Sequence, residues 1–230
     1  MSKYFWCEDT GAGYRFWKEI SDVIDPEIKV ESKRNNTGLR KAIEHITDNN
    51  NDYYVFIDMA IDNQDVLREI TRVNKIAASK DNVHVVNIHS FEFVLLSFEL
   101  LEKWVFAEQD ELREARKDLL SARDLLLKMV SEVIDQEEYS RIFDLTGYNK
   151  SKNSEQIAAS LLKSITRNTG FETNKRKLGE CFINDCCKWA DRSDNDKCGL
   201  DYSRLQSYEK KALLIRHSAL QKSFKEVGLI

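Results

Sequence analysis

The chain has 230 residues, with 35 basic and 39 acidic side chains, a net charge of −4 and an apolar fraction of 42%. This composition is typical of a globular protein, and the length suffices for one large domain or one domain with a helical appendage. An acidic balance gives no general attraction to nucleic acid, although a local basic patch is enough for binding. Because no apolar run approaches a membrane span and the first residues lack a secretory pattern, the sequence predicts a cytoplasmic protein without membrane contact.

The first 106 residues alternate between predicted strands and predicted helices. Short runs of β-branched and aromatic residues predict the strands, and apolar residues at helical spacing predict the helices between them. In chain order the predicted elements are strand 4–7, helix 14–24, strand 28–32, helix 39–47, strand 53–57, a helix beginning near 64, strand 83–88 and helix 91–106. This order with short connections predicts an α/β fold, a parallel sheet covered by helices.

No strand is predicted after residue 107, where we place a boundary between an α/β domain (1–107) and a C-terminal α-helical region (108–230). The predicted helices of this region are 111–134, 137–145, 157–165 and 207–227. The long first helix could pair with a second copy in a homodimer, or it could pack on its own domain.

Acidic side chains follow three of the predicted strands. Glu8 comes after the first strand, Asp58 and Asp62 after the third, and His89 and Glu92 after the fourth. Ligands of open α/β sheets bind at the carboxyl ends of the strands, and Mg²⁺ prefers carboxylate oxygens together with water and phosphate. These positions predict an acidic metal site, unless Glu8 only caps the helix that follows it.

The segment after the fourth strand has two interpretations. His89 could polarise a substrate, with Glu92 as an acid near the cleft. Alternatively, Ser90 is the N-cap of the next helix and Glu92 stands in its first turn, the arrangement that we expect.

Glycines and basic residues suggest phosphate contacts. Gly11 and Gly13 precede a predicted helix and could cradle a phosphate, but Phe16 holds the third position of the dinucleotide-binding fingerprint. The chain contains neither the P-loop signature nor the G-x-S-x-G elbow. Four basic residues near the end of the second strand are predicted to bind nucleic acid, with a solvated loop as the alternative: Lys33, Arg34, Arg40 and Lys41.

Four of the five cysteines, Cys181, Cys186, Cys187 and Cys198, lie within the segment 181–198. Thiolates favour tetrahedral zinc, so a structural Zn²⁺, completed by His217, is one hypothesis. The usual C-x₂-C spacing is missing, and small buried thiols that pack a helical subdomain are the interpretation we favour.

The strand-end acids resemble those of Toprim domains, a family with a Glu after its first strand and an Asp-x-Asp after its third. Glu8 and Asp58 stand at the corresponding places here. The likeness is greatest to the Toprim nucleases of bacterial anti-phage systems, the OLD-like and RloB-like groups. Cys7-Glu8 is followed by aromatic residues at the start of a helix, and the segment 90–98, SFEFVLLSF, looks similar to a stretch of the RloB-like group. The likeness covers about residues 1–106.

This resemblance implies a nuclease of DNA or RNA that depends on Mg²⁺ or Mn²⁺, with Glu8, Asp58 and Asp62 as catalytic and metal-binding residues. It also implies an effector of abortive infection that a partner ATPase or regulatory subunit restrains. The chain departs from the family in having Asp9 where a Gly is usual, and Ala60 where the second Asp is expected, with Asp62 as its substitute.

Two alternatives stay open at this point. A degenerate Toprim-like module could bind a partner ATPase or nucleic acid without cutting. A regulator stabilised by zinc at the cysteine segment is the third class.

Overall fold

The computed structural model describes residues 1–59, 62–107, 109–131, 136–187, 200 and 205–230. Its centre is a parallel sheet of four strands in the order β2-β1-β3-β4, which confirms the predicted α/β class. The strands are β1 (Lys3–Cys7), β2 (Lys29–Ser32), β3 (Asp52–Asp58) and β4 (Val83–Ile88). All four were predicted to within two residues, because each has a dense run of apolar and β-prone side chains.

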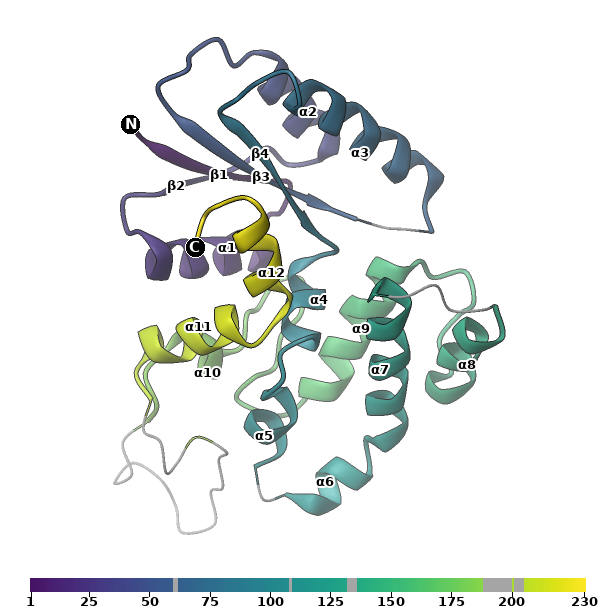
Figure 1. The fold of residues 1–230 in the computed structure, drawn as a ribbon. Helices are drawn as coiled ribbons and strands as arrows, with labels where there is room; N and C mark the ends of the chain where they lie inside the picture. Colours follow the sequence, from purple (N-terminus) through teal and green to yellow (C-terminus); the bar gives the residue numbers. More distant parts are fainter. Residues whose placement is uncertain (60–61, 108, 132–135, 188–199, 201–204) are drawn as a thin grey trace.

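Helices cover both faces of this sheet, as Figure 1 shows. One face, with Trp6 and Val55, packs against α2 (Asn36–Glu44) and α3 (Gln64–Ala77). The other face, with Phe5 and Phe56, packs against α1 (Ala12–Ile24) and the last helix, α12 (Ala219–Glu226). The alternation of side chains along each strand therefore feeds two separate apolar layers.

The remaining helices form the C-terminal helical region together with the helices that lead into it. They are α4 (Phe91–Leu96), α5 (Leu101–Phe106), α6 (Asp110–Glu114), α7 (Lys117–Ser131), α8 (Gln136–Thr146), α9 (Ser154–Thr166), α10 (Glu180–Ile183) and α11 (Ser207–Arg216).

Three predicted helices are each broken in two. The 91–106 helix stops at Ser97, whose hydroxyl accepts a hydrogen bond from the Ala219 N–H, and Glu99 donates its N–H to the carbonyl of His217. The 111–134 helix is interrupted near Arg116, whose guanidinium donates to the Arg167 carbonyl at 2.6 Å. These breaks are made by contacts with distant segments, so periodicity could not predict them.

The third break, at 217–218, turns the chain back onto the sheet. The Ser218 hydroxyl accepts from the Leu220 N–H and so caps α12. Phe224 of α12 then lies 6.5 Å from the ring of Phe5 and 6.2 Å from that of Phe56. One apolar core is therefore continuous across residue 107, and the division into two domains remains a prediction.

Two helices begin three residues earlier than predicted because asparagine side chains cap them. Asn35 accepts a hydrogen bond from the Gly38 N–H and Asn153 one from the Gln156 N–H. At α9 the Gln156 side chain reaches back to the Asn153 N–H, which completes a capping box. The box places Glu155 in the first turn of α9.

Candidate functional site: a cluster of half-buried carboxyl groups

The topology brings the end of β1 beside the end of β3. These strands are parallel neighbours, with Cys7 opposite Phe56, so the residues that follow them emerge at the same edge of the sheet. Glu8 and Asp58 are close enough there to influence each other's pKa, as the parallel order predicted. The backbone of Asn36, at the start of α2, lies near Glu8 and acts to lower its pKa.

Burial and neighbouring negative charge disfavour the ionised forms of both Glu8 and Asp58. Burial, followed by the charges of Asp9 and Glu155, raises the pKa of Glu8 to about 7. Burial, followed by the charges of Asp9 and Glu8, raises the pKa of Asp58 well above its usual value. Neighbouring carboxyl groups cannot both ionise cheaply, so the charge of Glu8 is one of the causes that raise the pKa of Asp58.

Asp9, which stands where the Toprim family has Gly, is held beside this pair. Its Oδ2 accepts a hydrogen bond of 2.7 Å from the Trp17 indole N–H. Burial raises the pKa of Asp9 to about 6, although the Trp17 hydrogen bond opposes this. Gly13 is required on the other side, because a β-carbon there would collide with the Asp9 carboxyl group.

Glu92 and Glu155 complete the cluster. Ser90 is the N-cap of α4 and accepts from the Phe93 N–H, as expected, and Glu92 stands in the first turn at 7% exposure. Burial raises the pKa of Glu92 to about 7. The charge of Glu155 raises the pKa values of Glu8, Asp9, Asp58 and Glu92. Sequence reasoning missed Glu155, since only the packing of α9 brings it to the sheet edge.

Asp62, the third predicted metal ligand, is engaged elsewhere. Its carboxylate accepts hydrogen bonds from the Ser154 N–H and the Ser154 hydroxyl, both at 2.8 Å, and from the Tyr139 hydroxyl at 3.1 Å. These three donors satisfy Asp62 as an anchor for α8 and α9. Ala60, which stands where the Toprim pattern has its second Asp, lies outside the described residues.

The described residues contain no group of three or more His, Cys, Asp or Glu side chains arranged to hold a metal ion. A pair such as Glu8 and Asp58 is still enough for Mg²⁺, which keeps several waters and binds substrate phosphates. The Oδ1 atom of Asn36 is buried and has no hydrogen-bond partner among the described residues. The Asn36 amide oxygen and the carboxylate oxygens of Glu8 and Asp58 are the kind of ligand atoms that fit a hard cation.

His89 is a structural residue of the β4 end. Its Nδ1 lies 2.9 Å from the carbonyl of Met59, and its ring packs on Phe93 with centroids 5.0 Å apart. Burial lowers the pKa of His89, so the ring is neutral at pH 7. A neutral imidazole fixed to the backbone holds the β3 and β4 ends together.

The four basic residues predicted to bind nucleic acid differ in their surroundings. Arg40 bridges α2 and α3, with contacts of 2.6 Å to both Glu44 and Glu69. Lys33 lies 2.6 Å from Glu31 and 4.1 Å above the Trp6 ring. Arg34 and Lys41 are exposed. Lys33 and Arg40 therefore already form ion pairs with glutamates, and Lys33 also contacts the Trp6 ring.

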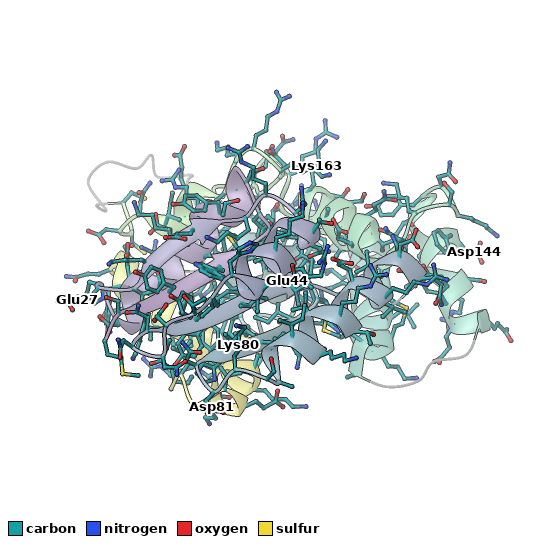
Figure 2. All side chains as sticks on the ribbon, turned by 90° about the horizontal axis from the view of Figure 1, so that it is seen from above. Glu27, Glu44, Lys80, Asp81, Asp144 and Lys163 are labelled. Atoms are coloured by element: carbon teal, nitrogen blue, oxygen red, sulfur yellow. The ribbon has the colours of Figure 1, made fainter. Side chains whose placement is uncertain are left out.

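A second basic surface, which sequence reasoning missed, lies on the other side of the acidic cluster. An open groove of about 540 Å³ runs between α9 and the turn at 174–177. Its basic lining residues are Lys152, Lys163, Lys175 and Arg176, and Glu92 lines it as well. Lys163, labelled in Figure 2, lies on the exposed side of α9.

The cysteine segment falls partly outside the described residues, which exclude Cys198. The Cys181 carbonyl accepts a hydrogen bond of 2.9 Å from the buried Lys210 ammonium, and Cys186 packs against the core. His217 is 3.0 Å from Glu99 through its Nδ1. The zinc hypothesis stays a prediction, because no metal-holding group occurs in the part of the chain that the structure covers.

Comparisons with protein-family models, curated proteins and solved structures found no match to this chain. The Toprim likeness is therefore a prediction from short sequence patterns. No helix within the described ranges is long and apolar enough to cross a membrane.

Proposed function

We propose that the chain is a metal-dependent phosphodiesterase that cleaves nucleic acid at the carboxyl edge of its sheet. The observation that carries this proposal is the pair of Glu8 and Asp58 at neighbouring strand ends, with Asp9, Glu92 and Glu155 close enough to raise their pKa values. So much negative charge at a half-buried site is costly unless protons or a cation compensate it.

Glu8 and Asp58 would hold a Mg²⁺ or Mn²⁺ ion, which in such sites neutralises the phosphate and activates the attacking water. Glu8 has a pKa of about 7, so it can take up and release a proton near neutral pH and suits general acid–base chemistry. Trp17 and Gly13 fix Asp9 beside the pair, and Ser90 orients Glu92. Asp62 positions α9 in this account and binds no metal.

The experiment that tests this proposal measures metal binding by calorimetry at pH 8, above the raised pKa values of Glu8, Asp9 and Glu92. Wild type should bind Mn²⁺, and Glu8→Gln and Asp58→Asn should each lose most of the affinity. Glu27→Gln is the control, because Glu27 is exposed on the loop before β2. Equal binding by all four proteins would overturn the assignment.

The second candidate is an interaction module that binds a partner ATPase or nucleic acid without cutting. It is favoured by the engagement of Asp62 with Ser154 and by the absence of a three-ligand group among the described residues. Nucleic-acid binding without cleavage in Mg²⁺ or Mn²⁺ would select it. A role in anti-phage defence and a regulatory partner stay predictions of the resemblance, and a homodimer stays a prediction from the long helix at 111–134.

A further inference from the structure

We propose that the groove between α9 and the 174–177 turn binds the phosphate backbone of a single-stranded nucleic acid and leads it to the acidic cluster. This inference rests on the proposed function for its final step, the delivery of a phosphodiester to Glu8 and Asp58. The binding itself can be measured without any cleavage.

The first argument is that the groove's cations are not neutralised. Lys163, Lys175 and Arg176 are exposed, and within the described ranges none of them lies in an ion pair. Lys152 donates to the Ser160 hydroxyl at 2.6 Å and stands 5.1 Å from the centre of the Tyr148 ring, which leaves its charge uncompensated too. Four clustered positive charges repel one another, and a chain of phosphates relieves this repulsion.

The second argument is that the groove adjoins the acids. The Lys175 carbonyl accepts a hydrogen bond of 3.3 Å from the Ala12 N–H, at the start of α1. That contact fixes the basic turn only a few residues from Asp9. Glu92 belongs to both the groove and the acidic cluster. A backbone that follows the cations therefore passes directly over the acids.

The third argument concerns the form of the nucleic acid. Glu92 is 7% exposed, and Glu8, Asp9 and Asp58 are half-buried, so the acids lie in a recess. Duplex phosphates lie on a stiff, convex surface that cannot enter a recess, whereas a single strand can bend into it. Polar side chains that could contact sugars and bases, Gln156, Ser160 and Asn174, line the same groove.

The test is the fluorescence anisotropy of a labelled single-stranded oligonucleotide, titrated with protein in EDTA at several salt concentrations. Replacing both Lys163 and Lys175 with Gln should weaken binding at least about tenfold at low salt. It should also make the slope of log K against log salt shallower by about 1.4, since each lost phosphate contact on a single strand removes about 0.7. The matched control replaces Lys103 and Lys225 with Gln, two exposed lysines on α5 and α12; this variant should bind like wild type.

Two results would overturn the inference: unchanged affinity and slope in the groove variant, or a duplex that binds as tightly as the single strand. If wild type binds through the groove but never cleaves with Mg²⁺ or Mn²⁺, the proposed function fails and the groove stands. If wild type cleaves while the groove variant binds normally, the groove assignment alone fails.

Discussion

Asp62 accepts hydrogen bonds from both the backbone N–H and the hydroxyl of Ser154, a residue 92 positions further along the chain, at 2.8 Å each. Ser154 is the first residue of α9 and is 5% exposed. The next residue is Glu155, whose charge raises the pKa values of the four other acids. The contact therefore sets the position of the helical region relative to the site.

Replacing Asp62 with Asn should destabilise the protein and leave its metal affinity largely intact. Asn offers one acceptor oxygen where the carboxylate accepts from three donors, so the buried Ser154 loses a partner at a cost of about 1–3 kcal/mol. Chemical denaturation measures this loss. Asp65→Asn is the control, because the Asp65 side chain is 91% exposed in a surface ion pair, where a change costs little. An Asp62→Asn protein of normal stability that no longer binds Mn²⁺ would show that Asp62 is a ligand after all.

Replacing Asp58 with Asn should stabilise the metal-free protein at pH 8 while removing metal affinity. Burial and the neighbouring acids disfavour the ionised form of the wild-type carboxyl group, and the neutral amide avoids this cost. Melting curves with and without Mn²⁺ would show both effects: a higher melting temperature than wild type in EDTA, and no further rise on adding metal. A lower melting temperature in EDTA would mean that the folded protein does not disfavour the ionised form of Asp58.

The stability of the metal-free protein should fall as pH rises from about 4.5 to about 7. Glu8 and Glu92 have folded pKa values of about 7 against an ordinary value of 4.5, and Asp9 about 6 against 3.8. Because these pKa values are raised, the folded state binds more protons than the unfolded chain in this window, and its advantage is lost as pH passes the folded values. One such acid accounts for at most roughly 3 kcal/mol.

Denaturant titrations at closely spaced pH values check this dependence. The slope should become shallower in Glu92→Gln, which removes one of the groups. Saturating Mn²⁺ should restore stability above pH 7, since the cation replaces the lost protons. A stability that rises steadily with pH across this window in EDTA would contradict the raised pKa values.

The contact between Gly13 and Asp9 can be tested as a pair. Gly13→Ala should destabilise the protein even though Ala favours helices, because its methyl group meets the Asp9 carboxyl group. Asp9→Ala/Gly13→Ala removes the collision, so the double variant should be more stable than the sum of the two single changes predicts. Additive effects would show that the two side chains do not meet.

The sheet and the pairing of Glu8 with Asp58 could be predicted from the sequence. Two apolar runs favour strands over a wide range of contexts: Tyr53 to Ile57 and Val83 to Ile88. When helices connect parallel strands, the carboxyl ends of all the strands lie at the same edge of the sheet. The neighbouring ends of β1 and β3 then follow from the fold class. Local patterns were sufficient because these features depend on short segments.

Other parts of the site could not be predicted because they depend on contacts between distant segments. Glu155 reaches the sheet edge only because Ser154 is bound to Asp62. Similarly, Lys175 adjoins the site because its carbonyl accepts from Ala12, and no local pattern records that contact. Arg40 has the sequence context of a phosphate ligand, yet Glu69 on another helix neutralises it.

Arg40 gives a prediction that separates the two basic surfaces. Arg40→Gln should lower the melting temperature slightly, because the α2–α3 bridge is lost, and should leave single-strand affinity in EDTA unchanged. The anisotropy titration described for the groove measures this affinity, with the Lys163 and Lys175 double variant as the contrasting case. A large loss of affinity in Arg40→Gln would move the binding surface to the end of β2.

The central claim is that Glu8 and Asp58 form the centre of a metal-dependent nuclease. The most direct test is cleavage of labelled single-stranded DNA and RNA by wild type and Glu8→Gln, in Mg²⁺, in Mn²⁺ and in EDTA. Wild type should cleave at least one of the two substrates with metal and neither in EDTA, and Glu8→Gln should be slower by about 10²-fold or more. Cleavage by Glu8→Gln at the wild-type rate, or no cleavage by wild type with either metal, would contradict the claim.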